Sequence, residues 1–286
     1  MRIDAHHHLW DTAARDHAWM DGPWADPIRG RFDTVRYTET AGAEVAESIV
    51  VQALHDEHET ADLLAGAGEP VAGVVGWVDL TAPDVAERLA KLRDGECGRR
   101  LVGIRHLVQD EPDPRWLLRE DTLRGVRAVR DAGLVYDVLI RPPQADAALE
   151  FARRLPEIRL VLDHLGKPDI AGGVWEPWAS WITAMAALPN VTVKLSGLVT
   201  EAAPGWRADD LLLYARHALA AFGPERTMYG SDWPVCTLAA PHEQVAEIAD
   251  RACADLDAAG HDAVFGGTAG RVYGLRPKAI HPMNHG

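Results

Sequence analysis

The sequence predicts an α/β fold, specifically a (β/α)8 barrel, and three observations support this. Short runs rich in β-branched residues alternate with amphipathic stretches, which is the pattern of a parallel sheet covered by helices. There are eight such runs, and a length of 286 residues suits a single barrel. The first run ends in histidines and lacks the glycine-rich turn of nucleotide-binding open sheets.

Each predicted strand is a short apolar run that ends where polar or turn residues begin. In chain order the predicted strands are Arg2–Leu9, Ser48–Leu54, Val71–Leu80, Leu101–Val108, Val135–Arg141, Arg159–His164, Val191–Ser196 and Thr227–Ser231. All of these apolar runs are too short to cross a bilayer, so no membrane-spanning segment is expected.

Helical patterns fill the connections between the strands. The predicted helices are Glu57–Ala67, Asp84–Arg93, Asp121–Ala132, Ala145–Leu155, Trp178–Leu188, Ala208–Phe222 and Glu243–Ala259. The first connection, Asp11–Glu47, shows no clear helix and is rich in Trp, Asp, Gly and Pro, as loops that form lids or pocket walls often are. We therefore expect a single barrel domain over residues 1–286, with an extended tail at 276–286.

The composition is that of an acidic globular protein. There are 29 Lys and Arg against 43 Asp and Glu, a net charge of −14, and 47% of the residues are hydrophobic. Nucleic acids and anionic membranes require a basic surface, so neither is an expected partner. The first residues lack the pattern of a secretory signal, and the three cysteines lack the spacing of a disulfide framework or zinc knuckle. A cytoplasmic location is therefore expected.

Ionisable and aromatic residues gather at the ends of the predicted strands, where a barrel forms its active site. They are His6, His8, Gln52, Trp77, Asp79, Arg105, His106, Tyr136, Arg141, His164, Lys167, Lys194, Asp232 and Trp233, to which the first connection adds Trp24. Their coincidence at one rim predicts a pocket that carries out chemistry.

The spacing of the first-strand histidines sharpens this prediction. His6 and His8 are two residues apart on a strand, so both point to one face while His7 points away. In a closed barrel the eighth strand lies beside the first, so Asp232 can reach the same point, and His164 can approach it from another wall. Such a set suits a zinc site, and equally suits water activation by a carboxylate.

Some of these residues have structural alternatives. Taken singly, His106, Asp79 and Lys194 are better explained as a hydrogen-bonding histidine, a structural aspartate and an ion-paired lysine. Asp163, which precedes His164, is a candidate for orienting a histidine rather than reacting itself.

Five blocks carry a family resemblance, namely Asp4–Asp11, Gly103–His106, Leu162–Pro168, Lys194–Leu198 and Tyr229–Val235. Together they resemble the amidohydrolase superfamily, and more narrowly its lactonase branch of L-fuconolactonases, L-rhamnonolactonases and 2-pyrone-4,6-dicarboxylate lactonases. The resemblance implies a barrel that hydrolyses lactones, with a divalent metal in some members and none in others. It assigns His6 and His8 to the H-x-H motif, His164 to the histidine of a later strand and Asp232 to the water-activating aspartate.

The resemblance also bears on the cofactor. Binuclear members place a carboxylated lysine at the end of the fourth strand, where this chain has Arg105 and His106, so a two-metal site is not expected. The expected cofactor is either none or one divalent metal, zinc first, held by His6, His8, His164 and Asp232.

Lactone hydrolysis needs a water nucleophile and stabilisation of the charge on the carbonyl oxygen. We expect Asp232 to take the proton from water, and the three histidines, or a zinc that they hold, to polarise the carbonyl with help from Arg105 and His106. The residues expected to bind substrate are Trp24, Gln52, Trp77, Asp79, Tyr136, Arg141, Lys167, Lys194 and Trp233. Tryptophan faces with scattered donors suit a neutral aldonolactone similar to L-fuconolactone, whereas a dicarboxylated pyrone would require more arginines.

Three other functions remain open at this stage. The same barrel could act as a pyrone-dicarboxylate lactonase or as a non-oxidative decarboxylase, or it could bind sugars or metals without catalysis. Turnover of a substrate panel with and without a chelator distinguishes these functions.

Overall fold

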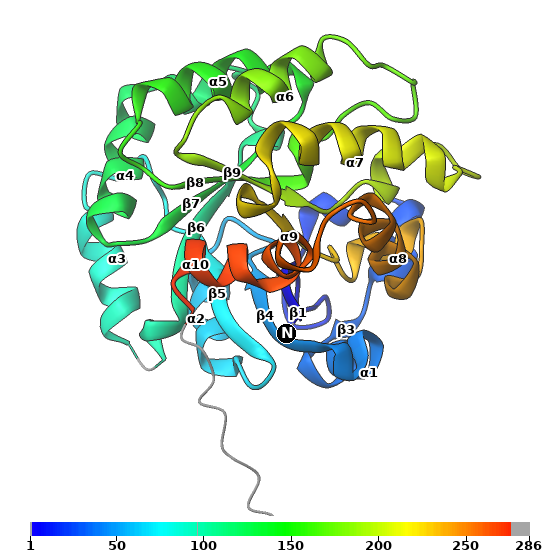
Figure 1. Ribbon diagram of the computed structural model, residues 1–286. Coiled ribbons are helices and arrows are strands. Elements are labelled where there is room, and N and C mark those ends of the chain that lie inside the picture. The colour runs from blue at the N-terminus through cyan, green and yellow to red at the C-terminus, as the bar shows by residue number, and fades with distance from the viewer. Residues whose placement is uncertain (1, 96, 276–286) are drawn as a thin grey trace, which may run out of the picture.

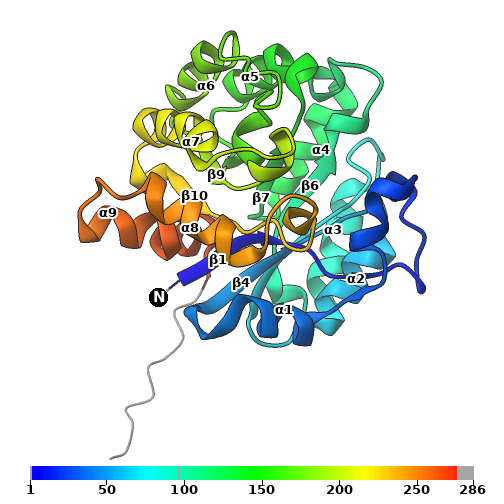
Figure 2. The same ribbon diagram turned by 90° about the vertical axis from the view of Figure 1, so that its right-hand side faces the viewer.

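The computed structural model describes residues 2–95 and 97–275, which form a barrel of eight parallel strands surrounded by helices (Figures 1 and 2). In order around the barrel the strands are β1 Arg2–His7, β4 Val45–Val51, β5 Val71–Gly76, β6 Leu101–Leu107, β7 Val135–Leu139, β8 Leu160–Leu162, β9 Val191–Leu195 and β10 Thr227–Tyr229. The fold class and all eight strands are thereby confirmed. The predicted tail at 276–286 lies outside the described residues.

Backbone hydrogen bonds between the two ends of the sheet close the barrel. The Asp232 N–H donates to the His6 carbonyl at 2.8 Å, and the His8 N–H donates to the Trp233 carbonyl at 2.7 Å. His7 and Trp233 form a parallel bridge at the same place. This closure fixes Asp232 directly beside the end of β1.

The helices cover the outside of the barrel. They are α1 Thr34–Ala41, α2 Glu57–Gly66, α3 Val85–Asp94, α4 Glu120–Asp131, α5 Ala145–Arg154, α6 Trp178–Ala186, α7 Ala208–Phe222, α8 His242–Ala252, α9 Ala258–Asp262 and α10 Thr268–Tyr273. None of the helices in the described part of the chain is long and apolar enough to cross a membrane.

Helix α4 shows why these segments are helical. Leu123, Val126 and Val129 are buried at helical spacing, while Glu120 and Asp121 lie in the first turn, where acidic side chains interact favourably with the helix dipole. Burying each of the three apolar side chains contributes about 1.5–3 kcal/mol. Packing against the strands therefore determines this helix more than its polar surface does.

Two predictions about the connections are wrong. The first connection contains α1, which has a single buried residue, Tyr37, and so lacks an apolar stripe in the sequence. Asp33 caps this helix, because its side chain accepts from the Arg36 N–H at 3.0 Å. The predicted helix Glu243–Ala259 is divided, because α8 ends at Ala252 and α9 begins only after Asp257, which caps it. A small antiparallel pair, β2 Trp10–Asp11 and β3 Arg31–Phe32, also lies in the first connection.

The amino-terminal end of the barrel is filled by a separate apolar cluster. The inward-facing residues Ile3, Ala5, Ile49, Val51, Val75, Val135, Val161 and Met228 pack there with Ala269, Val272 and Tyr273 of α10. Helix α10 thus lies over the end at which β1 begins (Figure 1). The opposite end of the barrel is left for the polar residues at the carboxyl ends of the strands.

Candidate active site

A cavity of about 740 Å³ opens over the carboxyl ends of the strands. Its walls come from the ends of several strands and from the connections that follow them, including the loop at 200–206. Among the predicted site residues, those lining the cavity are His8, Trp24, Arg105, Arg141, His164, Lys167 and Asp232. The placement of a pocket at this end agrees with the position of active sites in barrels of this kind.

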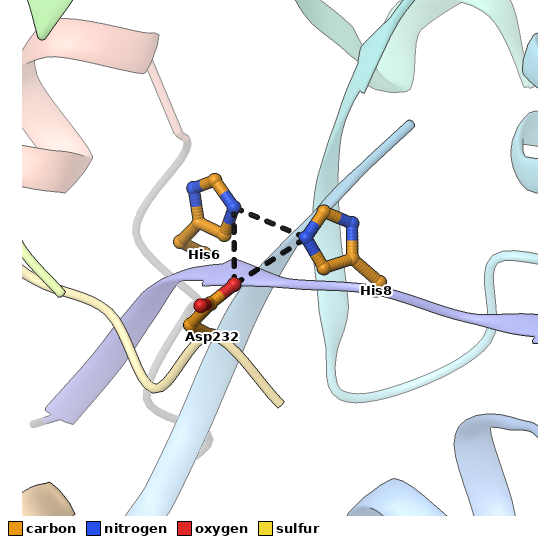
Figure 3. A group of neighbouring side chains, drawn as sticks. All are labelled: His6, His8 and Asp232. Carbon is orange, nitrogen blue, oxygen red and sulfur yellow. Dashed lines mark hydrogen bonds and ion pairs between the residues drawn. The ribbon is translucent and has the colours of Figure 1, made fainter. Parts of the chain in front are cut away.

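His6, His8 and Asp232 meet at the floor of this cavity (Figure 3). The two histidine Nε2 atoms are 3.2 Å apart, and Asp232 Oδ1 lies 3.7 Å from His6 Nε2 and 3.5 Å from His8 Nε2. His6 is fully buried, while His8 and Asp232 are about 5% exposed. His7 points away and bonds Ser48 Oγ at 3.0 Å, as the alternation along β1 predicts.

The spacing of these three atoms fits a single metal ion. Ligand atoms held 2.0–2.2 Å from one zinc at tetrahedral angles lie roughly 3.3–3.6 Å from one another. His8 Nδ1 is 2.8 Å from the Val51 carbonyl, which can only accept, so Nδ1 carries the proton and Nε2 offers a lone pair to the centre. His164 Nε2, 4.0 Å from Asp232 Oδ1, is the next ligand in reach.

Strained backbone aims the remaining polar groups into the cavity. His164, Leu165, Gly166 and Lys167 all have positive φ, between 53° and 71°, and Asp232 has φ 58°. This left-handed conformation costs roughly 1–2 kcal/mol for each non-glycine residue. Such strain is found mainly where function requires it. Here it brings His164 and Lys167 to the same wall.

Charges around Asp232 keep it ionised. Burial opposes ionisation, but His164, His8 and Lys167 outweigh burial and lower the pKa of Asp232 below its ordinary value. Burial lowers the pKa of His164 to about 4. At neutral pH the floor therefore presents an aspartate anion next to a neutral imidazole, the forms that bind a metal or accept a proton.

A second group, His6, Asp163 and His164, has ligand atoms close together, but Asp163 is already engaged. Its Oδ2 accepts from Arg105 at 2.9 Å, and its Oδ1 lies 3.0 Å from Lys194 Nζ and 3.4 Å from His6 Nδ1. Two cations thus occupy the positions around this carboxylate. Asp163 acts as the orienting partner of His6, and the arrangement suits one metal ion rather than two.

Two predicted binding residues lie beneath the cavity. Lys194 is fully buried against Asp137 at 2.6 Å and Asp163, so a substrate cannot reach it. Gln52 is also fully buried, and it holds Arg105 through its backbone carbonyl and, at 3.2 Å, through Oε1. Both support the floor from below. Lys194 starts deep in the barrel, whereas the Gln52 amide is held by Arg105, donating to its carbonyl and accepting from its guanidinium.

His106 lies on the outer side of β6, together with Trp77. The His106 ring stacks between His55 and Trp116, each with ring centres 4.0 Å away, accepts from Trp77 Nε1 at 3.1 Å and contacts Glu111 Oε1 at 2.7 Å. The structure therefore places His106 and Trp77 outside the cavity, because neighbouring strand residues point to opposite faces.

Three further predictions for substrate binding are corrected. The structure buries Tyr136 against Phe151 of α5, and it buries Trp233 against Phe32 and Tyr37. Asp79 accepts from the backbone and hydroxyl of Thr81 at 2.9 and 2.7 Å and does not line the cavity. Each belongs to the layer outside the barrel or to a turn.

Several cavity residues were not predicted, because they lie on loops whose paths the sequence pattern does not specify. They include Trp19, Gln109, Asp110, Glu201 and Trp206. Glu201 pairs with Lys167 at 3.4 Å. The polar residues that directly follow the strand Leu101–Val108 were a usable signal for Gln109 and Asp110.

Comparison with known proteins identifies the family. The chain matches the amidohydrolase family over residues 3–275. It is 41% identical to the L-fucono-1,5-lactonase of Burkholderia multivorans (strain ATCC 17616 / 249), over 96% of each chain. It is 28% identical to the L-rhamnono-gamma-lactonase of Scheffersomyces stipitis (strain ATCC 58785 / CBS 6054 / NBRC 10063 / NRRL Y-11545), over 52% of this chain and 50% of that one.

A solved structure agrees with these matches. A crystal structure of an amidohydrolase from Burkholderia multivorans with bound zinc superposes with a TM-score of 0.91 at 40% identity, over 96% of this chain and all of that one. The predicted resemblance to the lactonase branch is thereby confirmed. With a family match over nearly every described residue and a relative of this identity, the chain belongs to the amidohydrolase family.

Proposed function

We propose that this chain is a lactonase that opens the ring of an aldonolactone, with L-fucono-1,5-lactone as the first candidate substrate. The observation that carries the proposal is the cluster of His6, His8 and Asp232 at the floor of a cavity large enough for a sugar ring. The relative named L-fucono-1,5-lactonase, 41% identical over nearly the full length, supports the choice of substrate.

The cavity suits a neutral polyhydroxylated ring. Trp19, Trp24 and Trp206 provide aromatic surface for the C–H faces of a sugar, while Gln109 and Asp110 can exchange hydrogen bonds with hydroxyl groups. Two of the cations are already paired, Arg105 with Asp163 and Lys167 with Glu201. Arg141 is the remaining cation of the lining, and a dicarboxylated pyrone would require a second cation without a carboxylate partner, so the sugar lactone is preferred.

The proposed cofactor is one zinc ion, held by His6, His8 and Asp232 with His164 in reach of a fourth position. The spacing of the three ligand atoms and the proton position on His8 support this assignment. When bound, a zinc ion supplies Lewis-acid polarisation and lowers the pKa of a coordinated water.

The protein residues account for the proton transfers. Asp232 is ionised at neutral pH, and we assign to it the removal of a proton from the attacking water and its return to the ring oxygen as the C–O bond breaks. Arg105 lines the cavity with its Nη1 3.4 Å from His6 Nε2, so its positive charge stabilises the oxyanion that forms at the carbonyl. Lys167 adds a second positive charge on the wall.

The test is a hydrolysis screen with a pH indicator over 1,5- and 1,4-aldonolactones, a pyrone dicarboxylate and an aromatic carboxylate, each with and without chelation. We expect turnover of the sugar lactones, L-fucono-1,5-lactone among them, and loss of turnover on chelation with recovery on adding zinc. Turnover of the pyrone or release of CO₂ from the aromatic acid, with no sugar lactone hydrolysed, would refute the proposal.

A further inference from the structure

A buried network of charged side chains lies directly beneath the candidate ligand His6. Lys194 Nζ donates to Asp137 Oδ2 at 2.6 Å, forms an ion pair with Asp163 Oδ1 at 3.0 Å and lies 3.1 Å from His6 Nδ1. When His6 binds a metal through Nε2, its proton is on Nδ1, so the acceptor for Nδ1 is the Asp163 carboxylate and not the ammonium group. With Arg105 the network holds two anions and two cations, and none of these side chains is more than 2% exposed.

The network extends to the opposite end of the barrel. The last described helix, α10, lies over the end at which β1 begins (Figure 1). The side chain of its Tyr273 packs there with barrel residues such as Val135 and Val161. Its hydroxyl donates to the Asp137 carboxylate, with oxygen distances of 2.8 and 2.9 Å. The ring lies beneath Lys194, with Nζ 5.6 Å from the ring centre. No step of the mechanism proposed above involves Tyr273, Asp137 or Lys194.

A chain of contacts connects Asp137 to His6 through Lys194 and Asp163. Asp137 makes the shortest contact with Lys194, and so has the largest part in fixing its position. His6 Nδ1 is the ring nitrogen that faces away from the cluster, and its acceptor is Asp163 Oδ1 at 3.4 Å, which Lys194 holds at 3.0 Å. The partner of this nitrogen sets the orientation of a ligating imidazole.

We infer that Tyr273 is a positioning residue for the metal ligand His6, acting from the far end of the barrel through Asp137, Lys194 and Asp163. This inference rests on the proposed zinc site. Replacing groups that orient a ligating histidine typically lowers metal affinity by about 10–100-fold. Because Tyr273 acts through three intermediates, we expect the lower end, about tenfold.

The test variant is Tyr273→Phe, which keeps the ring and its packing and removes only the hydroxyl. The barrel offers matched controls, Tyr229→Phe and Tyr136→Phe. Both tyrosines are fully buried on barrel strands, and their hydroxyls have no hydrogen-bond partner among the residues described by the structure. Asp137→Asn is a second test variant, which removes the charge that holds Lys194 at nearly unchanged volume.

Two measurements are decisive. Zinc affinity is obtained by competition with a chromogenic chelator, and the ring nitrogens of His6 are observed by long-range ¹⁵N NMR on apo and zinc-loaded protein. We expect Tyr273→Phe and Asp137→Asn to lose about tenfold or more in zinc affinity and to shift the His6 ring signals. The control variants should remain within about twofold of the wild type, and KM for the lactone should be unchanged in all variants at saturating zinc.

The results separate the inference from the function. Equal zinc affinity and unchanged His6 signals in Tyr273→Phe and Asp137→Asn would overturn the inference, as would equal losses in the control variants. If the wild type binds zinc but hydrolyses no lactone, the proposed function fails, while the affinity comparison still decides the inference. A wild type that binds no zinc overturns the inference and the proposed cofactor, while turnover of the lactone by that protein still decides the proposed function. Should Tyr273→Phe fail to fold, Asp137→Asn decides by the same criteria.

Discussion

The substitution Gly197→Ala tests whether the position of His164 matters for activity. Gly197 follows β9 with φ +67°, and a Cβ built on it would lie 2.5 Å from His164 Nδ1 and 2.6 Å from Cγ. Ordinary contact begins at 3.4 Å, so the imidazole must move by about 0.9 Å (3.4 − 2.5). That movement would also break the 2.9 Å contact of Nδ1 with Ser196 Oγ. A misplacement of this size at a reacting centre can cost about 100-fold in rate.

The control is Gly223→Ala, because Gly223 has φ +74° and no neighbour within 4 Å of the added carbon. An alanine at positive φ costs roughly 1–2 kcal/mol at either position, so Gly223→Ala controls for the backbone cost, and the clash at Gly197 adds about 1–3 kcal/mol to the stability loss of that variant. The assay is kcat for the preferred lactone in zinc-saturated protein, with the melting temperature measured in parallel. We expect about 100-fold lower kcat for Gly197→Ala and a kcat close to wild type for Gly223→Ala. Near-normal kcat in folded Gly197→Ala would refute the role of His164.

Three further predictions follow from the same contacts. His106→Phe keeps the stacked ring but removes the contacts with Trp77 and Glu111. It should therefore lower the free energy of unfolding, measured in urea, by about 1–3 kcal/mol. A loss of kcat above roughly tenfold would show instead that His106 takes part in the reaction. His7 has its pKa lowered from 6.5 to about 4 by burial, so the unfolded state binds protons that the folded state does not. Stability should fall as the pH drops from 6.5 to 4, by up to ~3 kcal/mol from this residue, and His7→Phe should flatten the fall, whereas an unchanged slope would contradict the assignment. Zinc at 100 times its Kd should stabilise the protein by about 2.7 kcal/mol; a melting temperature that does not respond to chelation and zinc return would contradict the site.

The alternation of side chains along strands explains which site residues the sequence could predict. On β1 the rule holds from His6 to His8, with His7 outside. An irregularity in the strand pairing between Asp4 and His7 breaks the alternation before that, so Ala5 faces the interior as His6 does. The same rule separates Arg105 from His106, which are adjacent on β6 and point to opposite sides. Predicting both as catalytic neglected this rule.

How deep a side chain lies within the barrel is harder to predict from the sequence than the side of the strand from which it points. Lys194 points inward as expected, yet it lies too low to reach a substrate, and only strand tilt and register determine that height. Gln109 and Glu201 lie in turns that follow their strands, and the path of such a turn depends on contacts with distant residues, such as the Glu201–Lys167 pair. Tyr273 joins the barrel interior from helix α10, which was not predicted, so its hydrogen bond to Asp137 had no sequence signal.

Asp232, the base at the centre of the histidine cluster, is the residue on which the proposed reaction depends most directly. The decisive measurement is kcat/KM of purified, zinc-loaded Asp232→Asn on L-fucono-1,5-lactone, beside Asp79→Asn, whose aspartate bonds Thr81 outside the cavity. General-base catalysis contributes about 10²–10⁴-fold, so Asp232→Asn should lose activity in this range while Asp79→Asn keeps it. Retention of activity within tenfold of wild type by folded, metal-loaded Asp232→Asn would contradict the central claim.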